Sequence, residues 1–285
     1  MVLAKSSAAR FLLRKQAQIS MKIYSVMPWR RPNLGRPQGI VLLIFLSLPV
    51  AAQSRKSGFD FMQPATKAMQ RDDAQNPAML WVADGETLWN QQEGTANKSC
   101  ANCHGAAKQS MQGVAARYPA FSAITNKPIN LQQRINLCRT TKQKADALAL
   151  EHQNLLNLET YISLQSRGQK IVQSVSHKLN TARKQGASLF NTRMGQLDLS
   201  CADCHQTYAG YRLGGNVIPQ AHPTGYPLYR LEWQAVGSLQ RRIRNCMTGV
   251  RAEPFAYGSD EMLALEVYLS HRARGMIFEA PAVRP

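Results

Sequence analysis

The pattern of hydrophobic and polar positions predicts a mainly helical protein. In the segment 259–270, leucine, valine and tyrosine are mixed with acids and serine, as in an amphipathic helix, and basic residues and Gly275 then give a C-terminal stop. Shorter helices are predicted around residues 85–89, 131–138, 186–190 and 239–246. No stretch alternates between apolar and polar residues, so the sequence predicts no sheet.

The longest apolar run, Ile40 to Leu48, follows a segment that holds Lys and Arg but no Asp or Glu, and it precedes a small-residue end at Val50-Ala51-Ala52. These three features are typical of a secretory signal, and the run is too short to span a bilayer as a stable helix. We therefore predict a signal peptide at residues 1–52 and a periplasmic protein, with an N-terminal membrane anchor as the alternative. Met27 is a candidate true start, because an ordinary basic segment follows it.

The chain contains one unit written twice. A Gly-x-x-Leu-aromatic block, a Cys-x-x-Cys-His motif, an Arg-x-x-x-Cys block and a Glu-x-Tyr-x-Ser block recur in the same order, at 85–89 and 186–190, 100–104 and 201–205, 134–138 and 242–246, and 159–163 and 266–270. We predict an N-terminal extension at 53–77, a first domain at 78–170 and a second domain at 171–285. The polar stretch 166–176 is the predicted linker.

Both Cys-x-x-Cys-His motifs match the attachment signature of haem c. The two thiols, Cys100 and Cys103 or Cys201 and Cys204, add to the two vinyl groups of one porphyrin. The adjacent His104 or His205 then faces the iron as its proximal ligand. A zinc site would need further ligands near each motif, and a thioredoxin-like site would need a βαβ pattern, so we predict two covalent haem c groups.

The two remaining cysteines, Cys138 and Cys246, occupy matched positions in the two units. A low-spin haem needs a second axial ligand, and no His or Met outside the motifs is matched across the repeat. Cys138 and Cys246 are therefore the candidate distal ligands. A Cys138–Cys246 disulfide is the alternative in an oxidising compartment.

Each of these cysteines lies one helical turn after an arginine, Arg134 or Arg242. Guanidinium groups bind oxyanions bidentately, and a nearby cation favours the reactive thiolate. This arrangement suits a small anionic sulfur compound, with Arg244 and Arg251 as further candidates in the second unit. The alternative is that these arginines lie on a solvated helix face or bind haem propionates.

The charge of the chain agrees with an anionic substrate or an acidic partner. The 285 residues carry a formal charge of +18, and without the eight Lys and Arg of residues 1–52 there remain 27 basic and 17 acidic residues, a net charge of +10. A nucleic-acid partner is the weaker interpretation, since the sequence has no recognised nucleic-acid motif.

The paired motifs, the matched cysteines and the block Leu239-Gln-Arg-Arg-Ile-Arg-Asn-Cys246-Met resemble SoxA, the larger subunit of the SoxAX cytochromes of bacterial thiosulfate oxidation. The resemblance covers roughly residues 75–275. It implies two tandem class-I-like cytochrome c domains, with His104 and Cys138 on the first haem iron and His205 and Cys246 on the second.

The resemblance also implies a reaction and a set of partners. A SoxX-like monohaem cytochrome c would pair with this chain, and a SoxYZ-like carrier would present a cysteine that is joined oxidatively to thiosulfate. Cys246 would be the active-site persulfide, Arg242 would bind the substrate, and a soluble cytochrome c would accept the electrons.

Two other functions compete with this one. A diheme electron-transfer cytochrome would need no substrate site and would give Arg242 no part beyond redox tuning. A diheme peroxidase-like enzyme would need an open distal position, against which the paired cysteines argue.

Overall fold

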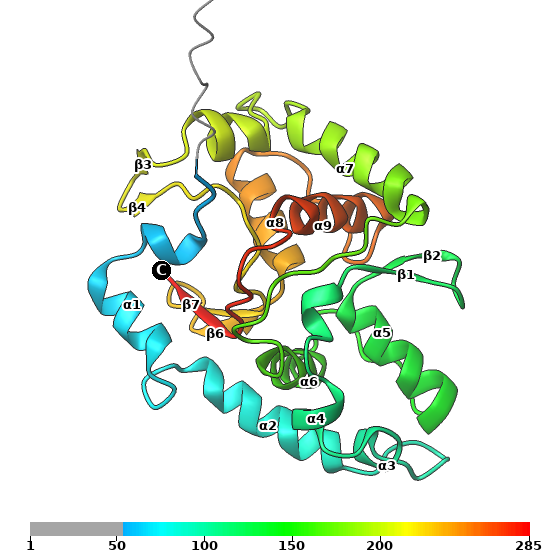
Figure 1. The fold of residues 1–285 in the computed structure, drawn as a ribbon. Helices are drawn as coiled ribbons and strands as arrows, with labels where there is room; N and C mark the ends of the chain where they lie inside the picture. Colours follow the sequence, from blue (N-terminus) through cyan, green and yellow to red (C-terminus); the bar gives the residue numbers. More distant parts are fainter. Residues whose placement is uncertain (1–53) are drawn as a thin grey trace, which may run out of the picture. The chain divides into compact units, whose positions relative to one another are not determined.

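The computed structural model describes residues 54–285, which form one compact unit (Figure 1). The predicted signal segment and its start at Met27 lie outside the described residues. In the first unit and the segment before it, the elements are η1 (Gly58–Phe61), α1 (Pro64–Arg71), α2 (Ala78–Asn90), α3 (Cys100–His104), α4 (Ala107–Ser110), η2 (Ala115–Arg117), β1 (Ala120–Ser122), β2 (Lys127–Ile129), α5 (Leu131–Cys138), η3 (Arg139–Gln143) and α6 (Gln153–Leu164). In the second unit they are η4 (His177–Leu179), α7 (Asn180–Asn191), η5 (Asp203–Thr207), β3 (Arg212–Leu213), β4 (Asn216–Val217), β5 (Leu228–Arg230), β6 (Ala235–Gly237), α8 (Leu239–Gly249), α9 (Asp260–Arg272) and β7 (Ala282–Arg284). The prediction of a mainly helical protein is confirmed.

The duplication appears as two equivalent helix pairs. In the first unit α2 packs against α6, and in the second unit α7 packs against α9 (Figure 1). Glycines make each crossing close, because a Cβ at Gly85 would collide with the Asn157 carbonyl and one at Gly186 with the Ala264 carbonyl. The Gly-x-x-Leu-aromatic block therefore marks a helix contact.

Residues 54–285 form three small sheets that the sequence did not predict. Strands β1 and β2 form one antiparallel pair, β3 and β4 another, and the third sheet has the order β6-β5-β7 with β7 parallel to β5. Each strand has only two or three residues, which is too short for an alternating pattern to be visible.

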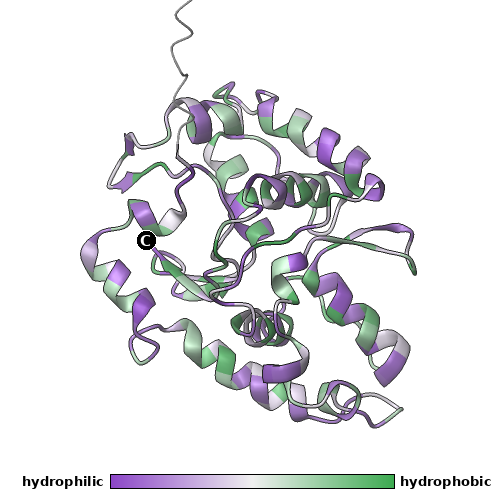
Figure 2. Ribbon diagram, viewed as in Figure 1, coloured by the Kyte–Doolittle hydropathy of each residue, from purple (hydrophilic) through white to green (hydrophobic). Residues whose placement is uncertain are grey.

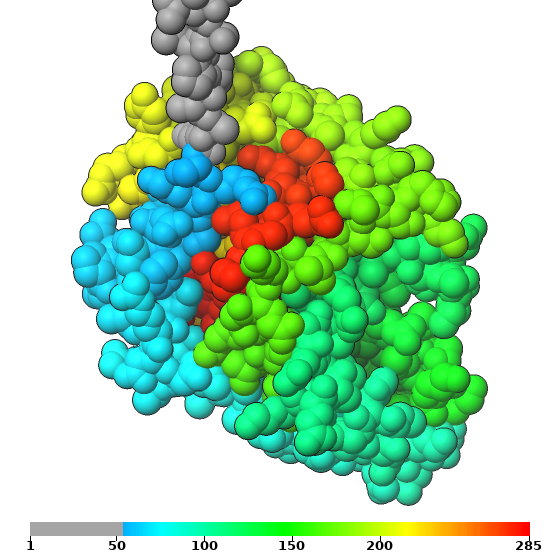
Figure 3. Space-filling view, in the orientation of Figure 1, coloured from blue at the N-terminus to red at the C-terminus, as the bar shows by residue number. Residues whose placement is uncertain are grey.

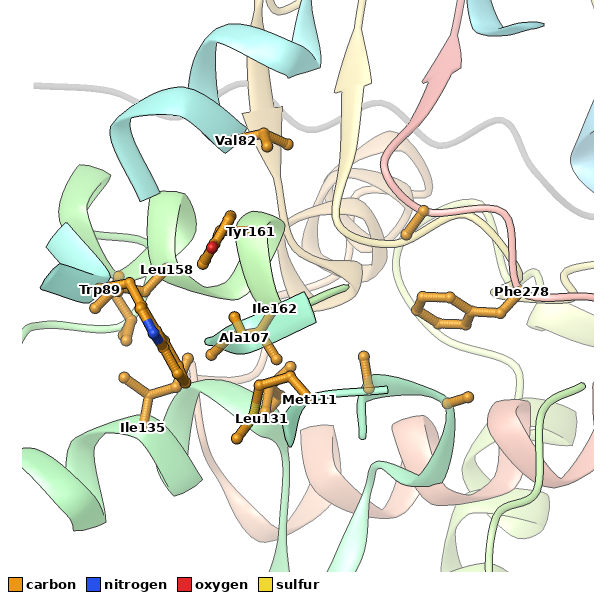
Figure 4. Close-up of a cluster of buried hydrophobic side chains, with 14 of the residues drawn as sticks. Val82, Trp89, Ala107, Met111, Leu131, Ile135, Leu158, Tyr161, Ile162 and Phe278 are labelled. Carbon is orange, nitrogen blue, oxygen red and sulfur yellow. The ribbon is translucent and has the colours of Figure 1, made fainter. Parts of the chain in front are cut away.

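The main hydrophobic core lies in the first unit and includes residues from the C-terminal end of the chain. Figure 4 shows Trp89, Ile135 and Leu158 gathered among α2, α5 and α6, and Phe278 belongs to the same cluster. A smaller cluster in the second unit consists of Phe190, Leu265 and Leu269. The C-terminal end of the chain thus completes the hydrophobic core of the first unit.

The segments at the predicted boundaries are packed. Gln173, in the predicted linker, is fully buried, and its side-chain amide donates to the Val267 carbonyl over 3.0 Å. Part of the predicted N-terminal extension forms η1 and α1, and α1 packs against β7 (Figure 3). The division at residue 170 stays a prediction, since the packing runs continuously across it.

The environment of α9 differs from the prediction of an amphipathic helix. Glu266 and Ser270 are as buried as the leucines around them. The exposed helices are α1 and α7, along which polar and apolar residues lie side by side (Figure 2). Within residues 54–285, none of the helices combines the length and the apolar character that crossing a bilayer requires.

Candidate haem sites and active site

Both Cys-x-x-Cys-His motifs sit on a capped helical turn. Ser99 caps α3, where its hydroxyl accepts from the Asn102 amide over 3.1 Å, and Ser200 caps the second motif through the same contact with Asp203. On such a turn the residues at i, i+3 and i+4 share one face, which brings two thiols and an imidazole together. This explains the spacing of the motif.

The imidazole of His205 is fixed in the form that an iron ligand needs. Its Nδ1 lies 2.7 Å from the carbonyl oxygen of Pro219. Because a carbonyl can only accept, Nδ1 must carry the proton, and the lone pair of the neutral ring is then on Nε2. The hydrogen bond to Pro219 fixes the orientation of the ring, as hydrogen bonds to the second ring nitrogen do in metal-binding histidines.

Cys246 lies close to His205. It is carried by α8, which Ser238 caps, and it is buried. Burial raises the pKa of its thiol, but the neighbouring His205 and the positive charge of Arg242 outweigh this effect, so that the pKa lies below its usual value. The site therefore favours the thiolate, the form that binds metals and reacts.

The first site brings its residues together in a similar way. Cys138, the last residue of α5, lies close to Cys100, and burial and this neighbour raise the pKa of Cys100 to about 11. His104 packs against Trp89, with 5.8 Å between the ring centroids. Cys138 and Cys246 thus lie beside different haem motifs, and all six cysteines are free, which argues against the disulfide alternative.

These residues fit haem c in both units. Each motif supplies two free thiols and an imidazole, and each has a further cysteine next to it. At the second site the protonated Nδ1 of His205 leaves the lone pair of Nε2 for a metal ion, and the nearby Cys246 would be a further ligand.

The arginines that follow Arg242 in the chain are engaged elsewhere. Arg244 donates to the carbonyls of Pro254 and Phe255 and lies over the ring of Tyr257, 4.6 Å from its centroid. Arg251 is exposed and has a left-handed backbone, with φ of 57°. Neither residue has a recorded contact with Cys246.

A different arginine, which the sequence did not indicate, acts on Cys246. Arg230, at the end of β5, contributes to the low pKa of Cys246 after burial, His205 and Arg242. Its guanidinium binds Glu232 over 2.5 Å and lies 5.3 Å from the centroid of Trp233. Arg230 lies outside the matched Arg–Cys block, so a search for motifs passes over it.

Comparison with known proteins agrees with this geometry. The SoxA/TsdA cytochrome c domain matches twice, at residues 84–171 and 185–278. The L-cysteine S-thiosulfotransferase subunit SoxA of Pseudaminobacter salicylatoxidans is 37% identical, and that of Rhodovulum sulfidophilum 34%, each over 80% of both chains.

The chain belongs to the SoxA family. The crystal structure of SoxXA from P. pantotrophus has 33% sequence identity and a TM-score of 0.78, covering 81% of this chain and 87% of that one. The fold is that of the SoxA cytochromes, with the cytochrome c domain present twice, as predicted.

Proposed function

We propose that this protein is the haem-bearing subunit of an L-cysteine S-thiosulfotransferase, which joins thiosulfate oxidatively to a cysteine of a carrier protein. The observation that carries the proposal is the buried Cys246, which lies against His205 with Arg242 one helical turn before it. The names of the SoxA relatives support the reaction.

The overall reaction needs an electron acceptor. Thiosulfate and a carrier thiol give a cysteine S-thiosulfonate: one S–S bond forms, the thiol proton is released, and two electrons leave. Haem supplies one-electron redox chemistry when bound. The residues that would hold it are Cys100, Cys103, His104 and Cys138 in the first unit and Cys201, Cys204, His205 and Cys246 in the second.

The side chains of the second unit prepare the sulfur chemistry. Arg242 binds and orients the sulfonate group through its planar fork of N–H donors. The Cys246 sulfur, as a persulfide, engages the sulfane sulfur of thiosulfate. The lowered pKa of the Cys246 thiol favours its anionic, reactive form, and the carrier cysteine forms the new S–S bond as two electrons leave.

Partners and compartment follow from the same proposal. A SoxX-like monohaem cytochrome c binds this chain, which the structural similarity to SoxXA supports. A SoxYZ-like carrier presents the acceptor cysteine, and a soluble cytochrome c takes the electrons in the periplasm. The net charge of +10 suits the dianionic substrate.

Replacing Cys246 with Ala tests the assignment. Since the reacting sulfur is then missing, we expect thiosulfate-dependent turnover with the carrier to fall roughly a thousandfold or more. Cys138→Ala is the matched control: it should alter the spectrum of the first haem and leave most of the turnover. Full activity of Cys246→Ala would refute the proposal.

Mass spectrometry separates this function from simple electron transfer. A transferase predicts a Cys246 peptide heavier by one sulfur atom, and reduction should remove that sulfur. A diheme electron carrier predicts unmodified Cys246 and normal electron transfer after Arg242→Gln.

A further inference from the structure

The two units of the chain provide an internal comparison, because both have a His, a Cys and an Arg in the same arrangement. From Tyr118 to Cys138 the first unit aligns with Tyr226 to Cys246 of the second without a gap, at a constant separation of 108 residues. The strand pairs agree with this alignment, since β1 and β2 correspond to β5 and β6 in bounds and register.

Arg134 and Arg242 take equivalent places in this comparison. Burial raises the pKa of both Tyr118 and Tyr226, and the positive charges of Arg134 and Arg242, respectively, act against it. The matched arginine therefore does not distinguish the unit with the reactive sulfur from the unit without it.

Arg230 is what distinguishes them. The residue at its position in the first unit is Ser122, and the surrounding Glu232 and Trp233 correspond to Ile124 and Thr125. Lys127, which pairs with Ser122 in the sheet, is 62% exposed and binds Asp260 over 3.4 Å. At the position of Arg230 the first unit thus has no cation, and the second charge near Tyr118 comes from Arg117, on a different segment.

The position of Arg230 is held by several contacts. It ends the central strand of the β6-β5-β7 sheet, where it pairs with Ala235 and Arg284. Its guanidinium and that of Arg241 both lie over the ring of Trp233, 5.3 Å and 4.5 Å from the centroid. This order restricts the side chain before any ligand arrives, which lowers the entropy cost of binding.

Arg230 also has donors that the protein leaves unused. Its side chain is 11% exposed, Glu232 takes one edge at Nη2, and the buried Nε has no hydrogen-bond partner among residues 54–285. Burial and the positive charge of Arg242 lower the pKa of Arg230. Arg230 and Arg242 repel each other, and in the described part of the chain the only carboxylate bound to Arg230 is the exposed Glu232, so an anion bound to both guanidinium groups would be stabilised.

We propose that Arg230 is a second substrate-binding residue, which together with Arg242 binds the dianion thiosulfate beside Cys246. Two guanidinium groups match two negative charges, and their forks match sulfonate oxygens. The inference rests on the proposed transferase function and assigns a role to a charge at a position where the first unit has Ser122.

The test uses the holo-protein in complex with its monohaem partner and compares Arg230→Gln, Arg230→Lys and Arg274→Gln. Arg274 is an exposed arginine of the same unit and serves as the matched control. Thiosulfate binding is measured by calorimetry and by KM with the carrier. Visible spectra and potentials of both haems report on folding and on the haem environment.

We expect Arg230→Gln to weaken thiosulfate binding and raise KM about 10- to 100-fold, the usual effect of losing a charged hydrogen-bonding group. Arg230→Lys should be intermediate, because the charge remains and the fork is lost, and Arg274→Gln should bind normally. Unchanged binding by a folded Arg230→Gln protein, with a shift in haem potential alone, would assign Arg230 to a haem propionate and overturn the inference.

A second measurement needs no variant. Two cooperating guanidinium groups predict that sulfate competes with thiosulfate at least tenfold better than nitrate at equal ionic strength, and equal competition would contradict the inference.

Cys246→Ser separates the two proposals. If it is active, the transferase function fails; if it is inactive while Arg230→Gln binds thiosulfate normally, only the role of Arg230 fails.

Discussion

At the scale of single residues, position in the chain was a good guide to which side chains of the haem motifs lie together and a poor guide to which arginines lie near Cys246. Cys201, Cys204 and His205 act within one helical turn, so their spacing already predicts their proximity. Arg244 lies only two residues before Cys246, yet its donors serve the carbonyls of Pro254 and Phe255. Arg230 is 16 residues away in the chain and acts on the same thiol.

Arg244 is therefore expected to stabilise the folded protein and to take no part in substrate binding. Arg244→Gln removes the contacts with the 254–257 loop and should lower the free energy of unfolding by about 1 to 3 kcal/mol. KM for thiosulfate should not change. Urea unfolding and steady-state kinetics check both parts, and a rise in KM at unchanged stability would return Arg244 to the substrate site.

At the scale of elements, the repeated blocks correctly predicted the main helices and missed how they pack. The sequence predicts a helix around Gly85 and another around Gly186, and α2 and α7 contain them. It does not predict that each glycine touches the backbone of a partner helix more than 70 residues away. The strands were missed because two or three residues show no periodicity.

These close crossings predict unequal effects of the same substitution. Gly85→Ala and Gly186→Ala each place a methyl group against a backbone carbonyl, so each should destabilise the protein by about 2 kcal/mol or more. Gly249→Ala is the control, because a Cβ there meets nothing within 4 Å at the end of α8. Thermal unfolding of the three variants tests this, and equal melting temperatures would disprove the close crossing.

At the scale of the whole molecule, the two units meet at buried acids. A cavity of about 70 Å³ is lined by Glu159 of the first unit and Glu266 of the second. Glu159 accepts from Gln132 over 2.7 Å, and Glu266 accepts from Asn130 of the other unit over 3.2 Å. Burial raises the pKa of Glu159 to about 8 and that of Glu266 to about 7, and the charge of Glu151 adds to both shifts.

These shifts predict a pH-dependent stability. The folded state holds protons that the unfolded chain releases near pH 4.5, so the stabilisation is complete below that pH and is lost as the pH rises through about 7 and 8. Glu159→Gln should remove part of this loss, making the variant more stable than the wild type at pH 8 by on the order of a few kcal/mol, with little difference at pH 4.5. Urea unfolding at both pH values measures it, and parallel pH profiles of the two proteins would show that Glu159 does not titrate in this range.

The sequence alone determined the duplication and predicted haem attachment and the candidate axial ligands, because these depend on spacings within one helical turn or on direct internal similarity. The tertiary structure decided which further arginine lies near Cys246, that Glu159 and Glu266 line one cavity, and that the end of the chain enters the first core. Such contacts join residues far apart in the chain. No local periodicity encodes them, and only the packing of one unit against the other creates them.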